Sequence, residues 1–323
     1  MRIEIELPRG RKSDGRKSDG RLFTHRSFYR NRALSPHPEN PGTTAPSNDA
    51  VILNRLKALE GLPPFPAVAS RILTECQKPA PEVDTIITLI ECDAALGGRV
   101  LQLVNSPLYA ASRQVTSIGH AVVMLGFKCV AQMAAAISAG QVFAGGSPDY
   151  ERYRRQTFEQ SLACATIAKG LSRYVDDVSA DEAFLAGVMH DVGKLVMLKV
   201  VPEAYCVLLE EHKDGMTSIC EVDQFGIDHS EVGNRCGAKW GLPAEINTAI
   251  NNHHRDFEQT DDGLSKVVIA ANYLARQQGI GAGPELATDT NKAIEEAIPE
   301  VQDSSLHETF REQYSAINEI CSV

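Results

Sequence analysis

The sequence predicts an all-α protein made of two packed helical bundles. Apolar residues recur at intervals of three and four from Val51 onward, the spacing that places them on one face of a helix. No segment shows the alternation of β-branched and polar residues that is typical of a strand. Pro107 and Gly126 interrupt two of the periodic segments, so we expect short helices.

Length and composition limit the possible classes of protein. The 323 residues provide enough chain for two or more domains with a sizeable core. No stretch approaches the ~18 consecutive apolar residues of a membrane helix, and the N-terminus lacks the apolar core of a secretory signal. We therefore expect no membrane association and a cytoplasmic location. The eight cysteines never come closer than Cys206 and Cys220, so there is no CxxC motif and we expect reduced thiols.

The net charge of −10 is distributed unevenly. Residues 1–33 carry ten Lys and Arg against four Asp and Glu, a net charge of +6, which leaves −16 for the rest of the chain. An acidic body disfavours a broad footprint on duplex nucleic acid, so we do not expect nucleic acid to be the main partner.

Residues 1–49 are expected to form a disordered basic arm and linker. The repeat GRKSDGRKSDGR has no periodic apolar positions. Residues 35–49, SPHPENPGTTAPSND, are rich in Pro, Ser, Asn and Thr, a composition typical of a linker.

Helical segments follow in order from residue 50. The first bundle is expected over residues 50–140, from VILNRLKALEGL through AVASRILTEC, VDTIITLIECD and LGGRVLQLVNSP to IGHAVVMLGFKCVAQMAAAISAG. The segment QVFAGGSPDY marks a joint, and the second bundle is expected over residues 150–280. Residues 281–323 form a predicted helical tail of one or two amphipathic helices, which could pack on the body or on a partner.

The segment FLAGVMHDVGKLVM, residues 184–197, places a histidine and an aspartate side by side in an apolar run. If the segment is one continuous helix, its apolar residues form a core face, while His190, Asp191 and Lys194 surround Gly187 on another face. This small polar recess could bind metal and phosphate, with Gly187 leaving room. Alternatively, Asp191 and Lys194 form an i, i+3 pair beside a hydrogen-bonded histidine. If the recess is exposed and serves recognition, replacing His190 or Lys194 should leave the melting temperature nearly unchanged.

Histidines cluster in the second bundle. Five of the nine lie between residues 190 and 254, namely His190, His212, His229, His253 and His254. His229 could be a metal ligand, a core histidine or a cap for the helix that begins there. His253 and His254 are adjacent, so on a helix at most one would face a given recess. Divalent transition metals favour imidazole and carboxylate together. The candidate ligands for one such metal ion are His190, Asp191, His229 and His253.

Several separated motifs resemble the HDOD domain. They are LPPFPAVASRIL, LIECDAALGGRVLQLVNSPLY, SIGHAVVMLG, HDVGK, DHSEVGNRCGAKWGLP and a final HH. HDOD domains are bacterial signalling modules related to the HD phosphohydrolases. The resemblance covers roughly residues 55–280, and it implies an HDOD domain over residues 50–280 whose second bundle is HD-like.

The resemblance also implies a test of catalysis. Active HD phosphohydrolases carry a histidine ligand on the helix before the HD pair and an aspartate ligand on a later helix. This sequence has Gln160 and Asn272 at those places. An amide oxygen is a poorer ligand for such metals than imidazole or carboxylate. The resemblance therefore implies a degenerate and non-catalytic site.

The remaining residues of the HD site resemble much of the extended group of site residues in HD-GYP cyclic-dinucleotide phosphodiesterases. These candidate ligand-binding residues are His190, Asp191, Lys194, His229, His253 and His254. We expect a regulatory module that recognises a signalling protein partner or a small phosphorylated ligand. The alternative is a metal-dependent phosphodiesterase or phosphohydrolase.

Overall fold

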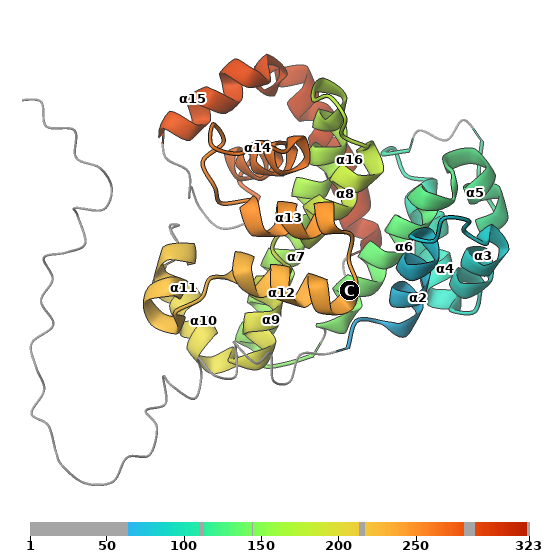
Figure 1. Ribbon diagram of the computed structural model, residues 1–323, viewed down its shortest axis with the longest axis horizontal. Helices are drawn as coiled ribbons and strands as arrows, with labels where there is room; N and C mark the ends of the chain where they lie inside the picture. The colour runs from blue at the N-terminus through green and yellow to red at the C-terminus, as the bar shows by residue number, and fades with distance from the viewer. Residues whose placement is uncertain (1–63, 110–112, 144, 213–216, 281–287, 322–323) are drawn as a thin grey trace, which may run out of the picture. The chain divides into compact units, whose positions relative to one another are not determined.

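The computed structural model describes residues 64–109, 113–143, 145–212, 217–280 and 288–321. These ranges contain helices and no strand, which confirms the all-α prediction (Figure 1). They belong to one compact unit. No helix in these ranges is both long enough and apolar enough to cross a bilayer. The arm predicted over residues 1–49 and the helix predicted at residues 51–62 lie outside the described residues.

A first group of helices packs around α6. The group comprises α2 (Ala67–Cys76), α3 (Val83–Glu91), α4 (Ala94–Val104), α5 (Ile118–Leu125) and α6 (Phe127–Val142). α6 contacts α2, α3, α4 and α5. The predicted break at Gly126 is confirmed, because this residue separates α5 from α6 with a φ of +83°, which glycine adopts without steric cost.

The following helices form the larger part of the body. They are α7 (Pro148–Leu171), η2 (Ser172–Tyr174), α8 (Ala180–Met189), α9 (Val192–Val200), α10 (Pro202–Glu211), α11 (Thr217–Phe225), α12 (His229–Trp240), α13 (Ala244–Asn252) and α14 (Gly263–Gln277). α7 begins after the predicted joint, where Ser147 accepts a hydrogen bond from the Tyr150 N–H and Pro148 opens the first turn.

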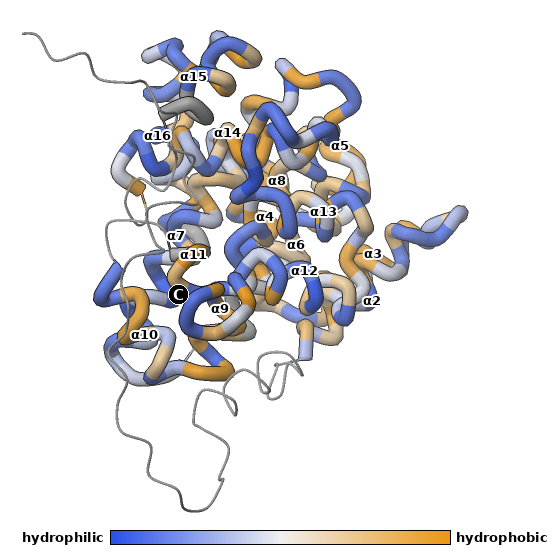
Figure 2. Tube along the Cα trace, turned by 60° about the vertical axis from the view of Figure 1, so that its left-hand side comes forward, coloured by the Kyte–Doolittle hydropathy of each residue, from blue (hydrophilic) through white to orange (hydrophobic). Residues whose placement is uncertain are grey.

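α7 is the central helix of the body and contacts α8, α14, α16 and α10. α8 is apolar and buried along residues 183–189, and Figure 2 shows it among the inner segments. The two helices approach each other so closely that a Cβ on Gly187 would lie 2.7 Å from the Ala165 backbone nitrogen. The interpretation of Gly187 as open space beside a polar recess is therefore wrong. Its missing side chain allows α8 to pack against α7.

The C-terminal tail packs on the body. It comprises α15 (Thr288–Ala297), η3 (Pro299–Gln302) and α16 (Ser304–Cys321), and α16 contacts α7 and α4. Phe310 on α16 is 2% exposed and lies over Gly170, where a Cβ would be 2.8 Å from the Phe310 Cζ atom. Of the two alternatives for the tail, the structure supports packing on the body.

The predicted continuous helix through residues 184–197 is wrong. α8 ends at Met189, and α9 begins at Val192. Asp191 between them has φ −97° and ψ 12°, outside the helical region. Residues 183–198 are all buried, so the segment is enclosed on every side. Its apolar pattern therefore continues across the break, and nothing in the sequence indicates that the helix ends.

A second close approach fixes the position of α9. A Cβ on Gly193 would overlap the carbonyl oxygen of His229 and would lie 2.8 Å from the backbone nitrogen of Gly233. Both of these residues belong to α12. Only glycine at residue 193 therefore allows α9 to lie directly against the first turn of α12.

We expect Gly193→Ala to lower the free energy of unfolding by about 1 to 3 kcal/mol, because the added methyl meets backbone atoms that cannot move alone. Gly98→Ala is the matched control. Gly98 is exposed within α4 and its added Cβ would meet nothing within 4 Å, so this change should stabilise by about 0.5 to 1 kcal/mol. Urea denaturation measures both variants. Equal effects would show that α9 and α12 are not in contact at Gly193.

Candidate metal centre

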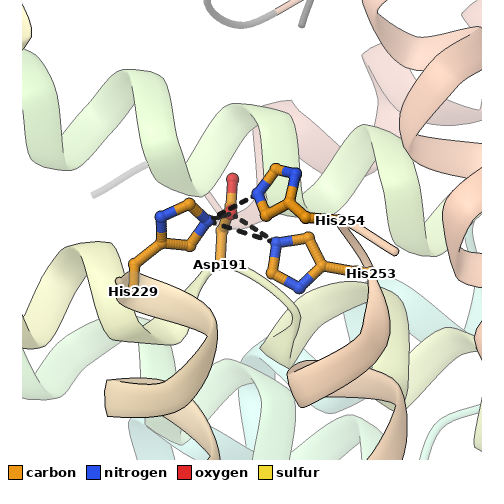
Figure 3. A group of neighbouring side chains, drawn as sticks. All are labelled: Asp191, His229, His253 and His254. Atoms are coloured by element: carbon orange, nitrogen blue, oxygen red, sulfur yellow. Dashed lines mark hydrogen bonds and ion pairs between the residues drawn. The ribbon is translucent and has the colours of Figure 1, made fainter. Parts of the chain in front are cut away.

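Three helix ends bring four side chains together. Asp191 precedes α9, His229 is the first residue of α12, and His253 and His254 follow the last residue of α13. One ligand atom from each of the four lies within 4.8 Å of the others. Figure 3 shows the three imidazoles pointing toward the carboxylate of Asp191. We call these four residues the histidine centre.

The separations within the histidine centre are those of ligands around one ion. Asp191 Oδ1 lies 3.3 Å from His229 Nε2 and 3.4 Å from His253 Nε2. His229 Nε2 lies 3.2 Å from His253 Nε2 and 2.8 Å from His254 Nε2. Ligand bonds of ~2.0 to 2.1 Å at tetrahedral angles require separations of about 3.3 Å between neighbouring ligand atoms.

Hydrogen bonds on the far side of the rings fix which nitrogen faces the centre. His253 Nδ1 lies 2.7 Å from the carbonyl oxygen of Ile250, and His229 Nδ1 lies 2.6 Å from a carboxylate oxygen of Glu221. A carbonyl or carboxylate oxygen only accepts, so Nδ1 carries the proton in each case. In the neutral ring, Nε2 then presents a lone pair to the histidine centre, as a metal ligand does.

The other oxygen of Asp191 faces two further predicted site residues. Lys194 Nζ donates a hydrogen bond of 3.0 Å to Oδ2, and His190 Nε2 lies 3.4 Å from the same oxygen. His190 donates from Nδ1 to the carbonyl oxygen of Gly187 at 2.8 Å. Its Nε2 is buried and finds no hydrogen-bond partner in the described part of the chain. All six predicted ligand-binding residues therefore lie together, while His212 sits at the exposed end of α10.

Burial and charge act in opposite directions on these groups. Burial tends to raise the pKa of Asp191, but the ammonium of Lys194 and the neighbouring imidazoles outweigh it and hold the pKa well below 3.8. Burial tends to lower the pKa of His229, but the carboxylates of Glu221 and Asp191 outweigh it and raise the pKa to about 9. Burial lowers the pKa of His190 to about 3, so this ring is neutral.

Two expectations about these residues are wrong, and one of the alternatives for His229 is excluded. The recess is not exposed, because His190, Asp191 and Lys194 are 0%, 1% and 7% exposed. His253 and His254 both face the histidine centre, because α13 ends at Asn252 and the adjacent residues no longer diverge as on a helix. His229 does not cap α12, since Asp228 does so by accepting a hydrogen bond from the Glu231 N–H.

The two amides at the expected ligand places bind each other. Gln160 Nε2 on α7 donates a hydrogen bond of 2.6 Å to Asn272 Oδ1 on α14, and Arg276 Nε lies 3.3 Å from the same oxygen. Both amides are buried. Asn272 Oδ1, the only atom of that side chain suited to a cation, is therefore already occupied by two donors.

Sequence reasoning missed Glu221. This glutamate on α11 is 0% exposed and contacts the ring and backbone of His229. The sequence pattern that could have identified Glu221 is its spacing from Phe225. This phenylalanine lies one turn later on the same face of α11 and is 2% exposed. A glutamate in line with a buried phenylalanine indicates a carboxylate inside the core, which requires a partner.

The histidine centre fits a divalent metal ion of the kind that HD proteins imply. Imidazole nitrogens 2.8 Å apart repel each other unless a proton or a cation lies between them. Without a metal ion the raised pKa of His229 keeps a proton on its Nε2, and a divalent ion would replace that proton. The unpartnered Nε2 of His190 is a further buried lone pair beside Asp191. Three imidazoles and one carboxylate suit zinc, iron or manganese. His254 is only partly buried and marks the solvent side of the centre.

Solved structures share this fold. An HDOD domain protein of unknown function from Geobacter sulfurreducens is 24% identical, with a TM-score of 0.63 over 84% of this chain and 95% of that chain. A protein from Shewanella amazonensis SB2B provisionally named a phosphohydrolase is 20% identical, with a TM-score of 0.62 over 84% and 98%. One from Marinobacter aquaeolei VT8 provisionally named a signal transduction protein is 23% identical, with a TM-score of 0.61 over 83% and 60%.

Sequence comparison identifies the family. An uncharacterized protein of Treponema pallidum (strain Nichols) is 25% identical over 199 residues, and the match spans 61% of this chain but only 38% of that protein. The profile of the HDOD domain matches residues 62–256, which include the histidine centre. Because this match covers more than half of the chain, the protein belongs to the HDOD domain family.

Proposed function

We propose that this protein is a regulatory module of signal transduction whose histidine centre holds one divalent metal ion and does not hydrolyse phosphate esters. In this role the centre and the groups beside it recognise a signalling protein partner or a small phosphorylated ligand. Membership of the HDOD family supports a signalling role, and so does the name given to the Marinobacter aquaeolei relative in fold.

The observation that carries the proposal is the hydrogen bond between Gln160 and Asn272. A second metal ion next to the first would need anionic or imidazole ligands from α7 and α14. These two positions supply neutral amides: Asn272 Oδ1 accepts from Gln160 Nε2, and Gln160 Oε1, buried and without a hydrogen-bond partner among the described residues, carries no charge for a second ion. The proposed site therefore has ligands for one ion and lacks the second ion that in-line phosphoryl chemistry would use.

Asp191, His229, His253 and His254 would hold the ion. When bound, such an ion supplies positive charge that attracts phosphate or carboxylate oxygens. The ammonium of Lys194 pairs with the other oxygen of Asp191 and so offsets the charge of that carboxylate, which leaves more of the ion's positive charge for the ligand. The partly buried His254 is the edge from which a ligand or partner would approach.

A metal-dependent phosphohydrolase or phosphodiesterase is the second candidate. The observation that favours it is the convergence of three imidazoles and a carboxylate with a lysine nearby, a set that could bind metal and phosphate together. The name of the Shewanella amazonensis relative in fold points the same way.

We expect the purified protein, with added Mn²⁺ or Fe²⁺, to hydrolyse neither cyclic dinucleotides nor generic phosphodiesters above background. The matched comparison is the double variant Gln160→His and Asn272→Asp, which restores the missing ligand types. Turnover by this variant alone would attribute the loss of activity to these two positions. If the wild-type protein turns over a substrate and His190→Ala abolishes that turnover, the proposal is contradicted and the second candidate is favoured.

We expect Lys194→Met to lower the free energy of unfolding by about 3 to 5 kcal/mol, because it leaves the buried carboxylate of Asp191 without its closest cation. The double variant Asp191→Asn and Lys194→Met removes both charges and should lose less than the sum of the single changes. Chemical denaturation of the metal-free protein measures the cycle. A cost below about 0.5 kcal/mol for Lys194→Met would show a solvated lysine with no structural pairing.

A further inference from the structure

Glu221 is buried without any role in the function proposed above. Its side chain is 0% exposed on α11, where an unpaired carboxylate would be strongly unfavourable. Each carboxylate oxygen has a donor. The Tyr205 hydroxyl on α10 donates to Oε1 at 2.5 Å, while His229 contacts Oε2.

The contact with His229 is double. The same oxygen, Oε2, accepts from the His229 backbone N–H at 2.7 Å and from the ring Nδ1–H at 2.6 Å. One atom therefore holds both the start of α12 and the orientation of the His229 ring. Rotation of the ring about its χ angles would break the second bond while the first stayed in place.

The Nδ1 atom of His229 contacts a carboxylate. The Nδ1 atoms of His190 and His253 contact backbone carbonyl oxygens, of Gly187 and Ile250 respectively. A carboxylate that accepts a hydrogen bond from Nδ1–H makes Nε2 a stronger electron-pair donor to a metal ion than a neutral carbonyl does. His229 Nε2 also lies close to both neighbouring rings, at 2.8 Å from His254 Nε2 and 3.2 Å from His253 Nε2.

We infer that Glu221, held in turn by Tyr205, is a positioning residue for a divalent metal ion at the histidine centre. This inference rests on the metal-binding part of the proposed function and adds two residues that would touch no metal themselves. Glu221 fixes the tautomer and direction of His229, and Tyr205 keeps the carboxylate from turning away.

Cobalt binding to the full-length protein tests the inference. Co²⁺ has visible absorption bands that report both its affinity and the arrangement of its ligands. Glu221→Gln keeps the shape of the side chain and removes its charge. We expect it to weaken Co²⁺ binding about 10- to 100-fold, as loss of a partner behind a ligand does, and to shift the absorption bands.

Tyr205→Phe is the second variant and has a matched control. It removes one buried hydroxyl bond and leaves the carboxylate, so it should weaken Co²⁺ binding less than Glu221→Gln does. Tyr150→Phe removes a buried hydroxyl bond of 2.6 Å to the carbonyl oxygen of Phe143, which is no part of the centre. It should leave the affinity and the spectrum unchanged.

The outcomes separate the inference from the proposal beneath it. If the wild-type protein binds Co²⁺ and Glu221→Gln binds it equally well with the same spectrum, Glu221 is structural and the inference is wrong. The inference is also wrong if Tyr150→Phe weakens Co²⁺ binding as much as Tyr205→Phe does, because a loss of stability would then explain both effects. A wild-type protein that binds no Co²⁺ would overturn the metal-binding proposal itself, and the inference with it.

Discussion

The buried carboxylate of Asp191 is the constraint on which the rest of the site depends. A carboxylate that is 1% exposed persists as an ion only if donors and cations surround it. Lys194 supplies the charge on one oxygen, and the rings of His229 and His253 face the other. The helix break places Asp191 between α8 and α9, and Gly193 lets α9 approach α12 closely enough for His229 to reach it.

The amide pair joins two helices of the body where the resemblance to HD phosphohydrolases implies metal ligands. Gln160 and Asn272 join α7 to α14 through a buried hydrogen bond, at the two places where a catalytic relative would carry ligands. Such a bond stabilises only modestly, but leaving either amide unpaired in the core would cost more. The two helices are thus linked through neutral amides, and the proposed lack of hydrolysis rests on this pair.

Sequence patterns predicted the all-α class, the break at Gly126 and the joint before Pro148, because glycine and proline act through the local backbone. The motifs also singled out the six candidate residues that the structure brings together, and their role in binding stays a prediction. The break at Asp191 was missed because the residues on both sides are buried, so the apolar period continues through it. His253 and His254 face the same way because α13 ends at Asn252, and no glycine or other typical capping residue in the sequence predicts that end. Glu221 was missed because its partner lies eight residues away on another helix.

The central claim is that the residues around Asp191 hold one metal ion and no more. The most direct test is the metal content of the full-length protein after dialysis against excess Zn²⁺, Mn²⁺ or Fe²⁺, measured by mass spectrometry with inductively coupled plasma. We predict one ion per chain, lost when both His229 and His253 are replaced by alanine. Two ions per chain in the wild-type protein, or one ion retained by the double alanine variant, would contradict the account.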